Sequence, residues 1–158
     1  MSENSTVRID DFDRAILRVL QADNSTPQRE IAERVGLSAP AVQRRVARLQ
    51  ATGVIMANTA VVDPDVVGQP VTAIITVSLR EDRTPMIERA SRFFAGEPAV
   101  QQCYFVNGGE TFIIVLSAAS LSHFDSLLRR LFGDNEDVAT YRTFIVLNRV
   151  KVGLSVPI

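Results

Sequence analysis

The residues best suited to chemistry in this chain are three arginines, Arg44, Arg45 and Arg48, in a stretch without Asp or Glu between Ser38 and Thr52. A guanidinium group donates hydrogen bonds from a planar fork, which fits phosphate oxygens and the edge of a guanine base. The pattern therefore predicts contact with nucleic acid. Arginines on an exposed helix often form only a solvated surface, so the surrounding elements must decide between the two interpretations.

The arginines are expected on the outer face of a helix that begins after Ser38. Val42, Val46 and Leu49 repeat at a spacing that places them on one buried face. Ser38 is a good N-cap, and Pro40 is tolerated in the first helical turn. The outward residues are then Arg44, Ala47, Arg48 and Ala51, with Gln43 and Arg45 on the flanks. Small residues beside long cationic ones suit insertion into a groove of DNA.

A second helix and a turn precede this one. Thr26 is expected to cap that helix, Pro27 to occupy its first position, and Gly36 to end it in a left-handed conformation. Its apolar stripe and the plug of the turn are Ile31, Ala32, Val35 and Leu37. An amphipathic helix at about residues 11–21 completes the small core with Phe12, Ile16, Val19 and Leu20. Together these features predict a helix-turn-helix whose last helix reads DNA.

Turn-forming residues divide the chain. After Gly53, the β-prone runs 54–56 and 59–62 predict a hairpin wing or the start of a connecting strand. Asp63-Pro64-Asp65 and Gly68-Gln69-Pro70 are two turns in succession, which indicates a linker. We therefore expect a DNA-binding domain at residues 1–62, a linker at 63–70, a second domain at 71–152 and a tail at 153–158.

The second domain alternates strands and helices. Strands are expected at residues 71–79, 100–107 and 111–117 and within 137–152, and helices at 84–95 and 121–132. Gly108-Gly109 joins the middle strands as a hairpin turn, and Gly133 ends the second helix. The order βαββαβ predicts a ferredoxin-like antiparallel sheet with both helices on one face. A second copy of the chain is the expected cover for the other face.

Composition excludes several classes of protein. The 158 residues are 46% hydrophobic and 22% charged, as in ordinary globular proteins. A polar N-terminus and the lack of a long apolar run predict a cytoplasmic protein. The single Cys103 is expected to be a small core residue, and His123, without a second ligand candidate, a surface or capping residue. No cofactor or metal is expected.

Charge is balanced over the chain as a whole. Eight basic and seven acidic residues precede residue 58, and nine basic and eleven acidic residues follow it, which gives the net charge of −1. Positive potential is therefore local to the arginine helix. This distribution favours a gene-specific DNA binder that needs dimerisation for affinity over a non-specific coat protein.

Five sequence stretches, taken in order, resemble one family. They are Ile9-Asp10-x-x-Asp13-x-x-Ile16-Leu17, Ile31-Ala32-x-x-Val35-Gly36-Leu37-Ser38, Arg45-Val46-x-Arg48-Leu49-x-x-x-Gly53-Val54-Ile55, Asp63-Pro64-x-x-Val67-Gly68 and Val138-x-x-Tyr141-Arg142-Thr143-Phe144-Ile145-Val146-Leu147. From about Ile9 to Lys151 the chain resembles the Lrp/AsnC (leucine-responsive, feast/famine) bacterial transcription regulators. The resemblance implies an α+β protein with a winged helix-turn-helix domain joined to a ferredoxin-like regulatory domain. It also implies dimers, assemblies from tetramer to octamer, and a small amino acid bound between dimers.

One departure from the family lies in the loop Val106-Asn107-Gly108-Gly109-Glu110-Thr111-Phe112. Thr111 occupies the place of an acid that leucine-type members use in their response, so an amino acid other than leucine is expected. The glycines expose N–H groups for a carboxylate, and Glu110 could hold an ammonium. The expected effector site is Gly108, Gly109, Glu110 and Thr111, with Thr143, Phe144, Ile145 and Val146 as its wall. The alternative is a plain hairpin turn with a solvated glutamate.

The residues assigned to DNA are Ser38, Gln43, Arg44, Arg45, Arg48 and Arg29. Gln43 and Arg44 are expected to read bases, and Arg29, Arg45 and Arg48 to contact phosphates. Two other classes were weighed. An enzyme is disfavoured because the sequence offers no nucleophile–base pair, metal-ligand cluster or phosphate-binding glycine loop. An architectural protein that compacts DNA with low sequence specificity remains an alternative, because a ring of dimers could wrap DNA.

Overall fold

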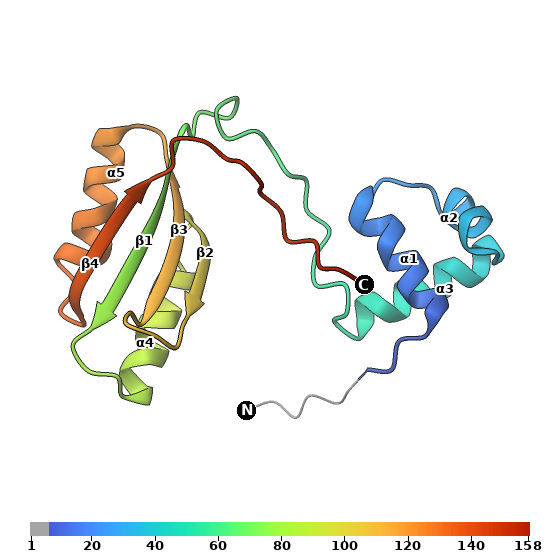
Figure 1. Cartoon of the computed structure of the whole chain (residues 1–158), viewed down its shortest axis with the longest axis horizontal. Coiled ribbons are helices and arrows are strands. Elements are labelled where there is room, and N and C mark those ends of the chain that lie inside the picture. Colours follow the sequence, from blue (N-terminus) through green and yellow to red (C-terminus); the bar gives the residue numbers. More distant parts are fainter. Residues whose placement is uncertain (1–6) are drawn as a thin grey trace. The chain divides into compact units, whose positions relative to one another are not determined.

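The computed structural model describes residues 7–158, which divide into two compact units (Figure 1). One unit holds the chain up to Ala60 together with residues 152–158, and the other holds residues 61–151. The backbone therefore passes between the units twice. Among the described residues, no helix is long and apolar enough to cross a membrane.

The first unit is a helix-turn-helix domain of three helices, α1 (Asp11–Ala22), α2 (Gln28–Val35) and α3 (Ala39–Ala51). Its core follows the expected apolar stripes of the three helices, except for Phe12, which is 44% exposed and lies against the Arg45 guanidinium. The apolar side chains with at most 1% of their surface exposed are Ile16, Ile31, Val42 and Leu49. Gly36 ends α2 with φ of 70°, and Ser38 accepts a hydrogen bond from the Ala41 N–H to cap α3. Both predictions are confirmed.

The predicted cap of α2 is wrong by one residue. Pro27 is the N-cap, and no side chain caps this helix. The Thr26 hydroxyl instead donates to the Asp23 carbonyl at 2.8 Å. Thr26 thus closes the turn that ends α1 and leaves α2 to begin after the proline, whose fixed φ suits that position.

The predicted wing strands do not form. Residues 54–62 contain no strand, and Met56 and Val61 are almost fully exposed. A strand needs a neighbour to receive its N–H and C=O groups. No other described segment pairs with this one.

The C-terminal segment is held by α1. The Gln21 side-chain amide donates to the Val156 carbonyl at 3.0 Å and accepts from the Val156 N–H at 2.8 Å. The Arg18 Nε donates to the Ile158 carbonyl at 2.5 Å. These contacts explain why residues 152–158 group with the first unit rather than ending as a separate tail.

The second unit confirms the βαββαβ prediction. Its elements are β1 (Val71–Leu79), α4 (Thr84–Ala95), β2 (Val100–Phe105), β3 (Phe112–Ala118), α5 (Leu121–Leu128) with a π-helical turn η1 (Arg129–Gly133), and β4 (Val138–Ile145). The sheet order is β2-β3-β1-β4, and every pair is antiparallel. The last strand lies within the expected range 137–152 but ends at Ile145, before Val146 and Leu147. The Val146 N–H still donates to the Thr72 carbonyl at 2.9 Å. Because β1 begins at Val71, it has almost no residues left to pair with the chain after Val146.

One face of the sheet is buried under α4 and α5. Ile75, Val77, Ile114 and Leu116 are fully buried there with Phe94 of α4. The cross-strand pairs Ile74 with Val115, Ile74 with Phe144, and Tyr104 with Ile113 point to the opposite face. That face has no covering element within residues 7–158, and Ile74, Tyr104 and Phe144 are 37–54% exposed.

Candidate functional site

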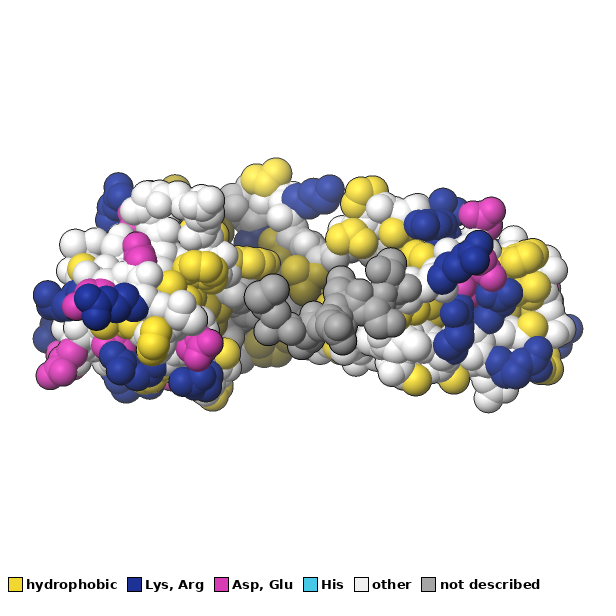
Figure 2. All heavy atoms as spheres, turned by 90° about the horizontal axis from the view of Figure 1, so that it is seen from below, with side chains coloured by type: hydrophobic (Ala, Val, Ile, Leu, Met, Phe, Trp, Pro, Cys, Tyr) yellow, Lys and Arg dark blue, Asp and Glu magenta, His cyan; other side chains and the backbone are white. Residues whose placement is uncertain are grey.

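The outer face of α3 presents the residues expected to read DNA. Gln43 and Arg44 are exposed, and within residues 7–158 Arg44 makes no ion pair. The Ser38 cap fixes the start of the helix from which they project. Figure 2 shows Lys and Arg side chains gathered on this domain, at the right of the view, with acidic side chains between several of them.

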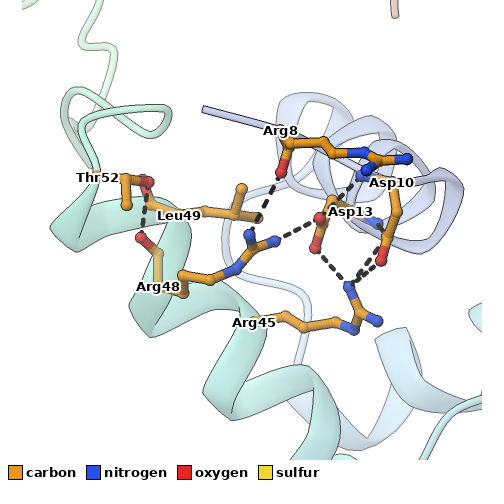
Figure 3. A network of polar contacts seen from close by, with 7 residues as sticks. All are labelled: Arg8, Asp10, Asp13, Arg45, Arg48, Leu49 and Thr52. Atoms are coloured by element: carbon orange, nitrogen blue, oxygen red, sulfur yellow. Dashed lines mark hydrogen bonds and ion pairs between the residues drawn. The ribbon is translucent and has the colours of Figure 1, made fainter. Parts of the chain in front are cut away.

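Arg45 and Arg48, which were predicted on the flank and the outer face of α3 as phosphate contacts, both reach across to α1 (Figure 3). The Arg45 Nη1 lies 2.8 Å from a carboxylate oxygen of Asp10 and 2.8 Å from one of Asp13. The Arg48 Nη2 pairs with the other Asp13 oxygen, and its Nη1 donates to the Arg8 carbonyl at 3.4 Å. Their side chains are still 27% and 42% exposed, so part of each guanidinium faces solvent.

Asp13 is a functional candidate that the residue-by-residue reasoning missed. Its carboxylate is 1% exposed. The signal was present: Asp13 precedes Ile16 and Leu17 by the spacing of the buried stripe of α1, where an acid must have cationic partners. The arginines of the acid-free α3 have no carboxylate on their own helix, which made them candidate partners for this acid.

The same carboxylates begin α1. Asp10 accepts from the Asp13 N–H at 2.9 Å, and Asp13 accepts from the Asp10 N–H at 3.1 Å, which is a reciprocal capping box. Burial opposes ionisation of Asp13 most strongly of any single cause. Hydrogen bonds from Arg48, the Asp10 backbone and Arg45 together outweigh it and lower the pKa of Asp13 to about 2.

An open hollow of about 780 Å³ lies between these groups and α3. Its lining residues are Arg8, Asp10, Asp13, Leu37, Ala41, Arg44, Arg45 and Arg48. Arg29, the remaining predicted DNA contact, lies exposed on α2 and pairs with Glu33 at 3.4 Å. Apart from Arg29, the predicted basic residues thus share one concave surface.

The predicted effector residues are not gathered into one pocket in the single chain. Thr111 is buried: its hydroxyl donates to Asp82 and accepts from the Leu79 N–H, both at 3.1 Å. Glu110 accepts from Ser78 and pairs with Arg142, so the carboxylate expected to hold an ammonium is already occupied. These two partners, Ser78 first, lower the pKa of Glu110.

The rest of that site lies apart along the sheet. Thr111 N–H donates to Val77, whereas Thr143, Phe144 and Ile145 pair with Ile75, Ile74 and Ala73, farther along β1. Gly108 and Gly109 are exposed with open space around them.

Cys103 and His123 both make structural contacts. Cys103 packs partly buried against the core, and this burial raises the pKa of its thiol. The Nδ1 of His123 accepts a hydrogen bond from the Ala119 N–H, and the His123 backbone N–H donates to the Ser120 hydroxyl oxygen.

The pairing of Asp13 should make the helix-turn-helix domain sensitive to acid. Because its pKa falls from 3.8 to about 2 on folding, the pairing stabilises the fold above the unfolded value and is lost as the pH falls towards 2. This shift corresponds to about 2 kcal/mol. Urea unfolding followed through the NMR signals of α3, at about pH 6 and about pH 2.5, should show that loss in the wild type and in Asp11→Asn. Asp13→Asn should lose about 2 kcal/mol less, and an equal loss in all three proteins would contradict the assignment.

Comparison with known proteins agrees with this architecture. A sequence model of the AsnC-type helix-turn-helix domain matches residues 9–50, and one of the Lrp/AsnC ligand binding domain matches residues 72–156. An uncharacterized HTH-type transcriptional regulator of Sinorhizobium fredii is 35% identical over 156 residues, covering 99% of this chain and 92% of that protein.

Solved structures extend the comparison to the fold. The leucine response regulatory protein of Mycobacterium tuberculosis superposes with a TM-score of 0.82 at 31% identity, over 94% of this chain and 100% of that one. A transcriptional regulator of Neisseria meningitidis, solved in complex with L-Met, gives a TM-score of 0.86 at 25% identity, over 95% and 97%. Since both domain models match in order and full-length relatives exceed 30% identity, the chain belongs to the Lrp/AsnC family of transcriptional regulators.

Proposed function

We propose that this regulator binds specific DNA sequences through α3 and that a free amino acid modulates its assembly. The observation that carries the proposal is the exposed pair Gln43 and Arg44, unpaired by carboxylates within residues 7–158, on the first half of a capped helix. That half of the second helix of a helix-turn-helix is the part that enters the major groove.

In this proposal, contacts divide by what each residue can reach. Arg44 reads a base, for which a guanine is the natural partner, and Gln43 contacts its neighbour. Arg29 and the solvent-facing edges of Arg45 and Arg48 contact phosphates. An arginine has five N–H donors, so one held by a carboxylate keeps others for DNA.

Replacing Arg44 by Ala should therefore weaken binding to the operator by about 1–3 kcal/mol and leave random DNA almost unaffected. The operator is the sequence that the wild-type protein selects from a random duplex library, and both dissociation constants are measured at one salt concentration. Arg92→Ala, an equally charged change at an exposed arginine of α4, is the control and should change neither. Equal losses on operator and random DNA would refute base reading. A wild type without any operator preference would instead favour the architectural alternative.

We further propose that the open face of the sheet joins two copies. Ile74, Val115 and Phe144 form an apolar band there, and the Thr76 hydroxyl oxygen is buried without a hydrogen-bond partner among the described residues. A monomer that left this band in water would forgo the hydrophobic stabilisation that a partner supplies. Two copies also present two α3 helices to two half-sites, which raises affinity through effective concentration.

Ile74→Arg should then convert the full-length protein to a monomer in sedimentation experiments at micromolar concentration. The substitution places an unpaired charge in the centre of the proposed interface. Leu121→Arg is the matched control, because Leu121 is 66% exposed but belongs to α5, on the covered side of the sheet. A wild type that sediments as a monomer, or dissociation caused equally by both variants, would contradict the interface.

The proposed effector site is the glycine loop with β4 as its wall, completed between copies. The L-Met complex of the Neisseria meningitidis regulator supports an amino acid as the ligand class. In this chain the groups still open on this side of the sheet are the backbone N–H groups of Gly108 and Gly109, which suit a carboxylate, and the exposed Phe144, which suits an apolar side chain. Glu110 binds an ammonium only if its carboxylate is shared between the ligand and Arg142, or if its ion pair with Arg142 breaks.

A thermal-shift screen of the standard amino acids should find one or more that stabilise the protein, with leucine not the best. A ligand at 100 times its dissociation constant stabilises by roughly 2.7 kcal/mol. Calorimetry should show this binding abolished by Gly108→Trp, which blocks the loop, and retained in Gly153→Trp, which adds the same ring at an open glycine outside the second unit. Binding that survives Gly108→Trp would move the sensor elsewhere.

A further inference from the structure

A buried carboxylate stands where α1 should present an apolar side chain. Asp13 shares the buried stripe with Ile16 and Leu17, and its side chain is 1% exposed. An apolar residue of similar size would fill this position without the cost of removing a charge from water. The acid therefore needs a reason beyond filling the core.

Its contacts are directional and connect two helices. One oxygen of Asp13 accepts from the Arg45 Nη1, and the other from the Arg48 Nη2 and the Asp10 N–H. Arg45 is held on two further sides, by both oxygens of Asp10 and by the Phe12 ring, whose centre lies 5.5 Å from the guanidinium carbon. Figure 3 shows the two guanidinium groups of α3 converging on these carboxylates of α1.

This arrangement fixes the rotation of α3 about its axis, which apolar packing alone leaves loose. Val42 and Leu49 bury one face of α3, but hydrophobic contact is non-directional and tolerates a small rotation or slide of the helix. Two charge-assisted links from a single carboxylate to successive turns of α3 do not. Since Arg44 adjoins Arg45 and lies one turn before Arg48, its direction is set by the same links.

We propose that Asp13 is a positioning residue for DNA reading: by holding Arg45 and Arg48 it sets the rotation of α3 about its axis, and so the direction in which Gln43 and Arg44 meet the bases. The inference rests on the proposed function, that α3 reads DNA. It adds that specificity depends on a residue of α1 that need not touch DNA.

Two other roles of these carboxylates predict different effects on DNA binding. If the carboxylates only masked positive charge, removing one would strengthen binding to every DNA sequence alike. If they only stabilised the fold, a variant that remains folded would bind operator and random DNA in the normal ratio. A positioning role predicts that the ratio falls while the affinity for random DNA does not.

The experiment compares Asp13→Asn with Asp11→Asn in the full-length protein. Asp11 is exposed and in the first turn of the same helix, so its substitution changes the net charge equally without touching the links. Asp11→Asn should shift both dissociation constants by the same factor. Asp13→Asn should lower the ratio of operator to random affinity by about tenfold, which corresponds to about 1.4 kcal/mol, with random binding unchanged or tighter.

A second variant guards against unfolding of the first. Asp10→Asn keeps a good N-cap and keeps Asp13, but weakens the grip on Arg45, so it should lower the ratio by a smaller factor in the same direction. NMR signals of α1 and α3 show that each variant is folded. The inference is overturned if folded Asp13→Asn or Asp10→Asn keeps the same ratio of operator to random affinity as Asp11→Asn. It is also overturned if either variant loses affinity equally for operator and random DNA. A wild type that binds no DNA rejects the proposed function itself.

Discussion

The pairing of one buried carboxylate with two arginines is the constraint on which the DNA-binding half of this molecule depends. A carboxylate removed from water must be compensated by hydrogen bonds and opposite charge, or it ceases to be ionised. Asp13 meets this condition only if α1 and α3 lie in one relative position. The small apolar core is built around the same geometry, with Ile16 and Leu49 fully buried beside the links. Core and ion pairs thus specify a single arrangement of three short helices, none of which would be stable alone.

The links also explain how an almost neutral chain can bind a polyanion selectively. Two of the three arginines of α3 have carboxylate partners, so the local excess of charge is smaller than the sequence suggests. A smaller excess of positive charge reduces the general attraction to phosphates, so base contacts supply a larger share of the binding free energy. Under the proposed function, affinity comes from the pairing of two copies, for which the uncovered apolar face of the sheet is the proposed surface.

Local patterns in the sequence predicted most of the fold, and interactions distant in sequence account for the differences. The stripes of α1 to α3, Gly36, Ser38 and the strand alternation each depend on neighbouring residues, and the structure agrees with them. The predicted wing does not form because a strand depends on a partner elsewhere, and residues 54–62 have none within residues 7–158. The carboxylate partners of Arg45 and Arg48 were not predicted, because a helical wheel shows in which direction a side chain leaves its helix but not what it contacts. Thr111 was placed in a pocket by its loop, yet its hydroxyl closes a contact between Asp82 and Leu79.

The same helix that orients α3 also receives the end of the chain. Gln21 and Arg18 of α1 bind Val156 and Ile158, and residues 146–151 connect this C-terminal segment to β4. The helix-turn-helix domain is therefore joined to the regulatory domain at both ends, after α3 by residues 52–60 and at α1 by the C-terminal segment. A ligand can shift an equilibrium only through a difference in its free energy of binding to two states. If copies pair through the sheet, both connections leave the unit that pairs, and the second ends on the helix whose carboxylate sets the direction of Arg44.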